Sequence, residues 1–296
     1  MRITVIEDAL EQAHLLCKRL HSASAASAVV TTASADMQGG FLAPDSDALL
    51  VVADEVFETV VPSSASPTPE TLSAPAVVVL AQDEARIPPG FFSLQRGALL
   101  FHGYTDAELQ RVLTWLRSPG RIAGDAQHAF CMSSSEPLIG RVADLLSRQC
   151  FDKGTGETGK ALRLGFDEAL RNAYEHGSLG IPAEEKARAC ASEEFETLLH
   201  EREAIARGAG KLIGIEIAYR ASEWRWTVTD AGAGFDWVTL LSAAKQSTLE
   251  QGGPLLESLQ RLRGRGLLLT VRVFDEVYYN QPGNAVTLVK RFPSRG

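Results

Sequence analysis

The stretch Leu164–Ser178, LGFDEALRNAYEHGS, decides how the second half of this chain folds. Apolar residues within it and just before it recur at three- and four-residue intervals, which predicts a helix with one buried face. These residues are Leu162, Phe166, Ala169, Leu170 and Ala173. Glu168 and Asn172 lie one turn apart on the flank of that face. A carboxylate beside a carboxamide suits a general base next to an oxygen ligand for a hard cation, although many solvated helices carry the same pair.

Composition and charge restrict the class of protein. The chain has 296 residues, more than a single domain usually contains, and its net charge of −8 argues against non-specific binding to nucleic acid or to an anionic membrane. The N-terminus lacks a signal-peptide pattern, and no apolar run is long enough to span a membrane. The four cysteines are scattered without metal-ligand spacing. We therefore expect a soluble, reduced, cytoplasmic protein of two domains that binds neither nucleic acid nor membrane.

The first half of the chain reads as a parallel sheet flanked by helices, because short apolar runs alternate with helical patterns. Glu7 and Asp8 follow the first run, and Asp54 follows the third. The carboxyl ends of parallel strands carry the site in such sheets, so we expect these acids at one edge. We predict a domain over residues 1–118, a linker over 119–127 that begins with a helix-breaking Pro-Gly pair, and a second domain over 128–296.

These acidic residues resemble the site of response-regulator receiver domains over roughly residues 1–118. In that family the acidic pair holds Mg²⁺, and the resemblance implies Asp54 as the phosphoryl acceptor. Two positions depart from the family: Ala81 stands where it has Ser or Thr, and Phe101–Gly103 stand where it has Lys. Because those two residues sense the new phosphoryl charge, we expect a receiver-like domain that no longer switches. A phosphorylatable receiver and an unrelated α/β domain remain open.

The segment Trp224–Trp237, WRWTVTDAGAGFDW, places a carboxylate and two glycines at the end of a strand. Its alternating aromatic and apolar residues predict a strand with one buried face, which ends at Asp230. A carboxylate there can accept a hydrogen bond from an exocyclic amine such as adenine N6. Gly232 and Gly234 let the backbone approach a flat base. A tight turn without a ligand is the alternative.

The segment Arg263–Leu269, RGRGLLL, has the composition of a phosphate-binding helix start. Gly264, Arg265 and Gly266 precede an apolar helical run, and a glycine-rich backbone with a guanidinium at a helix N-terminus binds phosphate. The long connection between Gly234 and this segment has the length of a mobile lid. A last strand is predicted around Thr287, near the end of the given sequence.

In this order, the three segments resemble the N, G1 and G2 boxes of GHKL ATPases, and most closely those of the bacterial anti-sigma regulatory factor (serine/threonine kinase) family. The resemblance covers roughly Ala126–Phe292. It implies an α/β sandwich whose mixed sheet is covered on one face by helices, with ATP between the helices and a lid. The whole chain is thus predicted as a two-domain α/β protein, with a receiver-like (flavodoxin-like) parallel sheet before the GHKL sandwich.

The resemblance also implies a role for each matching residue. Asn172 would ligate Mg²⁺ on the ATP phosphates, and Glu168 would accept the proton of a serine or threonine hydroxyl. Asp230 would read adenine N6. The remaining implied nucleotide contacts are Gly232 and Gly234 at the base, Gly264, Arg265 and Gly266 over the phosphates, and Thr287 supporting Asp230.

We therefore expect an ATP-dependent protein serine/threonine kinase in a bacterial partner-switching or stress-signalling pathway. Its partners would be a STAS-type anti-anti-sigma protein, a sigma factor or a similar client. The alternative is a nucleotide-binding module that sequesters a partner without catalysis. Residues 179–210 depart from the shorter family members and predict one or two charged helices, either a solvated face or a surface for a partner or a homodimer.

Overall fold

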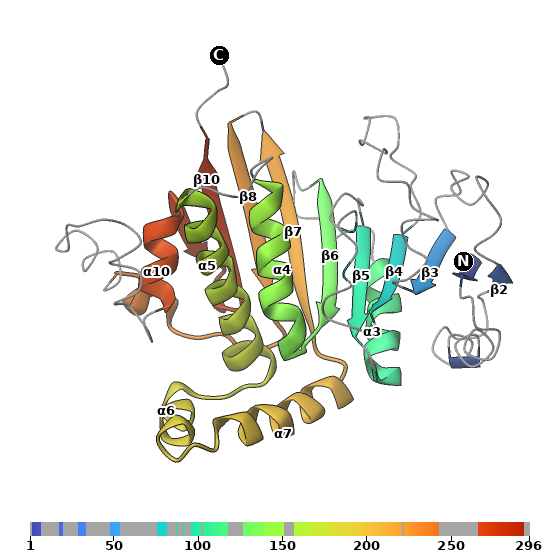
Figure 1. The fold of residues 1–296 in the computed structure, drawn as a ribbon, viewed down its shortest axis with the longest axis horizontal. Coiled ribbons are helices and arrows are strands. Elements are labelled where there is room, and N and C mark those ends of the chain that lie inside the picture. Colours follow the sequence, from blue (N-terminus) through green and yellow to red (C-terminus); the bar gives the residue numbers. More distant parts are fainter. Residues whose placement is uncertain are drawn as a thin grey trace. The chain divides into compact units, whose positions relative to one another are not determined.

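In the computed structural model the chain forms two compact units. Figure 1 shows their helices and strands. The first contains Met1–Ser133 with Arg207–Leu212, and the second contains Ser134–Ala206 with Ile213–Gly296. The structure describes residues 2–6, 18–19, 29–33, 48–53, 76–81, 87, 91, 96–101, 103–117, 127–150, 157–220, 222–242 and 266–292. The predicted α/β class is confirmed. The predicted domain limits stay a prediction, since the proposed linker is described only at Gln127.

The described strands of the first unit form a parallel sheet in the order β2-β1-β3-β4-β5-β6. The strands are β1 (Arg2–Ile6), β2 (Val29–Ala33), β3 (Ala48–Ala53), β4 (Ala76–Ala81), β5 (Arg96–Phe101) and β6 (His128–Ser133). Val78 and Leu99 are fully buried, as expected of strands in a sheet covered on both faces. The order of the first five strands is one of the two common orders of doubly wound folds.

The acidic residues predicted for a receiver-like site, Glu7, Asp8 and Asp54, lie outside the described residues. The receiver-like interpretation therefore stays a prediction. Ala81 and Phe101 are the last residues of β4 and β5, so the two departures from the receiver pattern do fall at strand ends.

Helix α3 (Asp106–Arg117) lies between β5 and β6 in the chain and begins with a capping box. The Thr105 N–H donates to Glu108 Oε2 (2.8 Å), and the Glu108 N–H donates to Thr105 Oγ1 (3.1 Å). The buried Glu108 carboxylate is paired with Arg207 at 3.3 Å, and Thr105 Oγ1 donates to the Arg207 carbonyl. These bonds explain why Arg207 belongs to the first unit.

The second unit is built on an antiparallel sheet in the order β7-β8-β10-β9. Its strands are β7 (Leu212–Arg220), β8 (Glu223–Thr229), β9 (Glu276–Tyr279) and β10 (Ala285–Arg291). Figure 1 shows helices α4 (Glu136–Gln149) and α5 (Glu157–Asn172) side by side over one face of this sheet, with α10 (Gly266–Val273) beside α5. A sheet covered on one face by helices is consistent with the predicted GHKL sandwich.

The predicted apolar face of α5 is confirmed, because all its residues are buried: Leu162, Phe166, Ala169, Leu170 and Ala173. Phe166 is fully buried and meets Trp226 edge-on, with ring centroids 5.0 Å apart. It also meets Phe274 edge-on, with ring centroids 5.2 Å apart. The ring joins α5 to β8 and to the end of α10, the elements that carry the predicted site.

We expect Phe166→Ala to lower the free energy of unfolding by about 3–5 kcal/mol, the usual cost of emptying a buried aromatic site. Denaturant unfolding followed by circular dichroism measures this change. The matched control is Leu164→Ala on the same helix, because Leu164 is 36% exposed and its removal leaves no cavity. A loss below about 1 kcal/mol for Phe166→Ala would contradict its place at the centre of the core.

The helix does not continue in α form after Asn172. Residues Ala173–Ser178 form a π-helix, η4, in which the Leu179 N–H donates to the Tyr174 carbonyl at 2.8 Å. Spacing of apolar residues predicts a helix here but cannot distinguish the two forms over a single turn. Single π turns inside α-helices occur frequently at functional sites.

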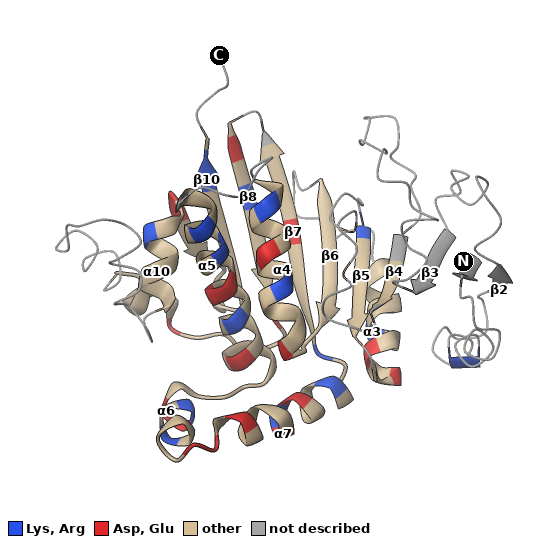
Figure 2. Cartoon of the chain, viewed as in Figure 1, with Lys and Arg blue, Asp and Glu red and all other residues tan. Residues whose placement is uncertain are grey.

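Residues 179–210 form two helices, α6 (Ala183–Ala191) and α7 (Phe195–Gly208), as predicted. Figure 2 shows that basic and acidic residues both occur along them. They are nevertheless tied to η4 by polar contacts. Lys186 is paired with the buried carboxylate of Glu175, and the Tyr174 hydroxyl donates to Glu203 Oε2 at 2.5 Å. The insert therefore contacts the turn that directly follows Asn172.

Among the described residues, no helix combines the length and the apolar character needed to cross a membrane.

Candidate functional site

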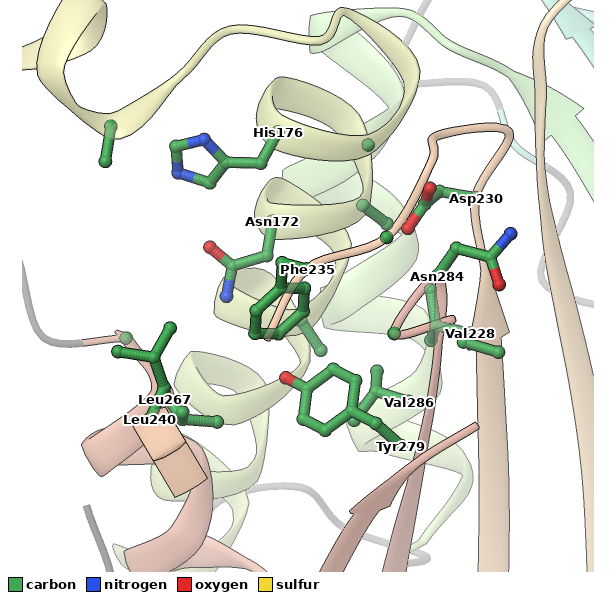
Figure 3. Close-up of a pocket in the computed structure, with 18 of the residues that line it drawn as sticks. Asn172, His176, Val228, Asp230, Phe235, Leu240, Leu267, Tyr279, Asn284 and Val286 are labelled. Atoms are coloured by element: carbon green, nitrogen blue, oxygen red, sulfur yellow. The ribbon is translucent and has the colours of Figure 1, made fainter. Parts of the chain in front are cut away.

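A cavity of about 840 Å³ lies in the second unit (Figure 3). It lies between the α5–η4 helix, the last residues of β8, the first residues of β10 and the start of α10. This size is within the range of pockets for small ligands. The predicted residues Asn172, Asp230, Gly234 and Gly266 all lie on its wall. The structure thus brings together residues from all three predicted boxes.

Asn172 is the last residue of α5 and is half-buried on the cavity wall. Its carboxamide extends from the helix into the cavity (Figure 3). A carboxamide oxygen is a suitable ligand for Mg²⁺, which keeps most of its water molecules and takes few protein ligands.

Asp230 follows β8, at the wall opposite the Asn172 carboxamide in Figure 3. Its Oδ1 accepts the Gly232 N–H at 2.7 Å, and its own N–H donates to the Asn284 carbonyl at 2.9 Å. The backbone of Gly177 in η4 packs directly on this carboxylate, because a Cβ at Gly177 would overlap the Asp230 Cγ. The end of the helix and the end of the strand therefore fix the Asp230 side chain between them.

The loop after Asp230 is held by the turn between β9 and β10. The Phe235 N–H donates to the Pro282 carbonyl at 3.1 Å, and Gly234, at φ +84°, lies so close that a Cβ would overlap the same oxygen. Asn280 Oδ1 shapes the turn by accepting three backbone N–H groups at 3.0–3.1 Å, those of Gly283, Asn284 and Ala285. The described part of this loop is thus positioned by close backbone contact.

Aromatic side chains form one side of the cavity beside Asp230 (Figure 3). The rings of Phe235 and Tyr279 meet edge-on with centroids 5.1 Å apart, and Trp237 lies nearly parallel to Tyr279 at 6.2 Å. Burial, together with the negative charge of Asp230, raises the pKa of Tyr279 to about 12, so its hydroxyl stays a donor at neutral pH. Flat apolar surface beside a carboxylate suits a planar base that bears an amine.

Glu168 does not line the cavity but lies immediately behind its wall. A Cβ at Gly266 would overlap the Glu168 carboxylate, so this carboxylate packs against the first residue of α10. Burial first, and then the charge of Asp167, raise the pKa of Glu168 above its usual value. A negative charge at a helix start is favourable, and a carboxylate with a raised pKa is a stronger base.

The other predicted residues are placed differently or lie outside the described part. Gly264 and Arg265, and residues 243–265 of the predicted lid, are outside the described residues. Gly232 and Thr287 do not line the cavity. The Thr287 hydroxyl is hydrogen-bonded to Thr227 Oγ1 at 3.0 Å, the residue that it faces across β8 and β10. Their roles as nucleotide contacts stay predictions.

Sequence reasoning did not find several residues of the wall: Gly177, Ile181, Phe235, Tyr279 and Asn284. The sequence does show a glycine, Gly177, at the end of the helical pattern. It does not show that this glycine contacts Asp230, because the two residues are far apart in the sequence. The aromatic residues have no local sequence signal that distinguishes the wall of a cavity from a core or a loop.

Comparison with known families identifies this domain. A sequence model described as histidine kinase-like ATPase domain matches residues 139–290, slightly more than half of the 296-residue chain. The chain belongs to the histidine kinase-like ATPase domain family. The match runs from α4 to β10 and contains the whole described cavity wall. No curated protein matches the chain.

Membership of the histidine kinase-like ATPase family confirms the predicted GHKL-type, ATP-binding domain, with Mg²⁺ typical of the family. The residues of the cavity fit ATP with a bound Mg²⁺ ion. The cavity has room for a nucleotide, its aromatic side and Asp230 suit adenine, and Asn172 offers one oxygen to the metal. The match does not extend to the N-terminal 138 residues, so it does not test the receiver-like interpretation.

Proposed function

We propose that this histidine kinase-like ATPase domain is an ATP-dependent protein serine/threonine kinase of the anti-sigma type. The observation that carries the proposal is that Asn172 and Asp230 line the same cavity, with the Glu168 carboxylate packed against Gly266 of its wall. The client would be a STAS-type anti-anti-sigma protein in a bacterial partner-switching or stress-signalling pathway. A sigma factor or similar client would be the released partner, and the receiver-like domain would be regulatory.

The proposed binding mode follows the chemistry of the wall. Asp230 would accept a hydrogen bond from the adenine amine, while Phe235 and Tyr279 would contact the faces and edge of the base. The phosphates would then extend toward Asn172 and the start of α10 at Gly266. Bound Mg²⁺ would neutralise part of the phosphate charge, with Asn172 as its protein ligand.

Phosphoryl transfer needs positioning and one proton acceptor. The hydroxyl oxygen of the client serine or threonine forms a bond to the γ-phosphorus, and the bond to the β,γ-bridging oxygen breaks. ADP is the leaving group, and the hydroxyl proton passes to the carboxylate of Glu168. Because burial raises the pKa of Glu168, this carboxylate holds a proton more readily than an exposed glutamate does.

The second candidate function is a nucleotide-binding module that sequesters a partner without phosphoryl transfer. The observation in its favour is that Glu168 lies behind the cavity wall, against Gly266. A carboxylate that stayed there would not reach a client hydroxyl. The two candidates therefore differ in whether bound ATP turns over.

The test is transfer of labelled γ-phosphate from Mg-ATP to the STAS-domain proteins of the same genome, each incubated with the full chain. We expect phosphoserine or phosphothreonine on one of them. Asn172→Ala should reduce the transfer at least about 100-fold, because the metal loses its protein ligand.

A binding measurement separates the candidates. Calorimetric titration with Mg-ATP shows whether nucleotide binds at all. Binding without transfer to any STAS-domain protein would favour the sequestering module, whereas absence of binding by the wild type would contradict both functions.

A further inference from the structure

The π turn η4 contacts the residues that are proposed to read the base. Its Gly177 packs on the carboxylate of Asp230, which lies beside the end of this helix in Figure 3. A Cβ at Gly232 would come within 2.9 Å of the Gly177 Cα. The place of Gly177 depends on the π form, because the Leu179 N–H reaches five residues back to the Tyr174 carbonyl. Since π turns are rare, contacts from outside η4 that favour this form also set the place of Gly177.

The first such contact joins η4 to helix α7 of the insert. Tyr174 is buried, and its hydroxyl donates to Glu203 Oε2 at 2.5 Å. Burial first, and then this hydrogen bond, raise the pKa of Tyr174, so the hydroxyl stays a donor to the carboxylate. The start of α4 holds the same carboxylate: Oε1 accepts the Ser135 hydroxyl at 3.0 Å, and Oε2 accepts the Glu136 N–H at 2.9 Å. Glu203 therefore ties η4 to a fixed point on α4.

The second contact joins the next residue of η4 to helix α6. The Glu175 side chain is 2% exposed and is paired with Lys186, while Arg171 lies 3.8 Å from the same carboxylate. A buried carboxylate needs such partners, because water no longer solvates its charge. The Glu175 carbonyl also accepts the Ile181 N–H at 2.9 Å. The side chain and the backbone of Glu175 thus both hold the first residues of the insert.

Polar contacts rather than apolar burial hold α6 in place. None of its nine residues is buried. Its Glu185 is paired with Arg202 of α7 at 2.9 Å, and its Lys186 is paired with Glu175. Residues 180–183, which lead into α6, line the cavity. Loss of the pair between Lys186 and Glu175 would therefore loosen both the π turn and this part of the wall.

We propose that Glu203 and Lys186 of the insert are positioning residues for nucleotide binding. By holding η4 in its π form, they hold Gly177 against Asp230, the carboxylate proposed to read the adenine amine. This inference rests on the proposed nucleotide-dependent function and adds two residues that lie outside the three boxes and do not line the cavity. It makes the insert a determinant of base specificity, because a displaced Asp230 loses its hydrogen bond to the amine. A residue that only supports the fold would weaken all nucleotides alike.

The test compares Mg-ATP with the triphosphate of purine riboside, which has a hydrogen in place of the adenine amine. The Kd of each nucleotide is measured by calorimetry on the full chain. The wild type should bind ATP about 10-fold to 100-fold more tightly, the range for one hydrogen bond to a charged group. The ratio of the two Kd values therefore reports whether Asp230 is in place, which a measurement of stability does not.

Two substitutions break one contact each. Tyr174→Phe removes the hydroxyl that bonds to Glu203 but keeps the buried ring, and Lys186→Met removes the positive charge beside Glu175. Each should lower the ratio of Kd values at least about 3-fold by weakening ATP, and should change the affinity for the purine nucleotide less than about 2-fold. Lys186→Arg keeps the charge and should keep the wild-type ratio. The matched control on α7 is Glu201→Gln, because Glu201 is exposed.

An unchanged ratio in Tyr174→Phe and Lys186→Met would overturn the proposal, and so would equal weakening of the two nucleotides. Thermal unfolding without nucleotide checks that each variant is folded. Tyr174→Phe leaves the ion pair of Glu175 intact, so this variant decides the matter if Lys186→Met does not fold.

These outcomes differ from failure of the proposed function. If the wild type bound neither nucleotide, the function itself would be wrong, and the inference would fall with it. If the wild type bound both nucleotides equally, the base-reading role of Asp230 would be lost. If the wild type and the variants all preferred ATP to the same degree, only the roles of Glu203 and Lys186 would be wrong.

Discussion

Gly177→Ala is expected to lower the affinity for Mg-ATP about 100-fold or more while the chain stays folded. A Cβ at this position would overlap the Asp230 carboxylate, which must then leave the wall and lose its hydrogen bond to the base. A hydrogen bond to a charged group contributes about 1.5–3 kcal/mol, and its displaced partner loses further contacts. Alanine is otherwise well tolerated in helices, so the damage is confined to the contact with Asp230. Calorimetric titration measures the affinity.

The matched control for Gly177→Ala is Gly140→Ala in α4. At Gly140 the nearest atom to an added Cβ is Asp167 Oδ1 at 3.8 Å, an ordinary contact distance. This variant should bind Mg-ATP as the wild type does. Unchanged affinity in Gly177→Ala would show that the contact with Asp230 does not position a nucleotide-binding group.

Glu168→Gln is expected to reduce phosphoryl transfer to the client about 100-fold to 10,000-fold, the usual contribution of a general base. Affinity for Mg-ATP should change little, because Glu168 lies behind the cavity wall rather than on it. Single-turnover transfer measures the chemical step, and calorimetry measures binding. Transfer at the wild-type rate in this variant would rule out Glu168 as the base.

The pH dependence of the transfer gives a second measurement of the same group. A base acts when deprotonated, so the rate should fall as the pH falls through the pKa of Glu168. Burial and the charge of Asp167 raise that pKa, which places the decline above the range of an exposed glutamate. Asp167→Asn serves as the comparison, because it removes one of these causes and should move the decline to lower pH.

The local structure around the site follows closely from the sequence. The apolar spacing of α5 predicts its buried face, and the alternation of Trp224, Trp226 and Val228 predicts one buried side of β8. Trp226 and Val228 are buried, whereas Trp224 is half-buried. These patterns depend on periodicities that residue types reveal directly. The charged sequence of the insert predicts one or two helices, and the structure has two.

The contacts that assemble the cavity could not be predicted in this way. The approach of Gly177 to Asp230, and that of Gly234 to Pro282, join segments whose distance in space no local pattern encodes. The position of Glu168 behind the wall depends on how α10 begins, a matter of packing rather than of spacing. The hydrogen bond between His176 Nδ1 and the Ile181 carbonyl, 2.6 Å long, depends on η4, whose form the apolar spacing does not distinguish.

The π turn makes the length of this segment matter as much as its residue types. In η4 a backbone hydrogen bond spans five residues instead of the four of an α-helix, so a single deletion within Ala173–Ser178 would close the turn in α form and move the residues between Asn172 and Leu179. Gly177 would then face away from Asp230, and the first residues of the insert would leave the wall, even if every side chain were kept. In an alignment of related chains, a one-residue gap here would therefore separate proteins that share this cavity from those that do not.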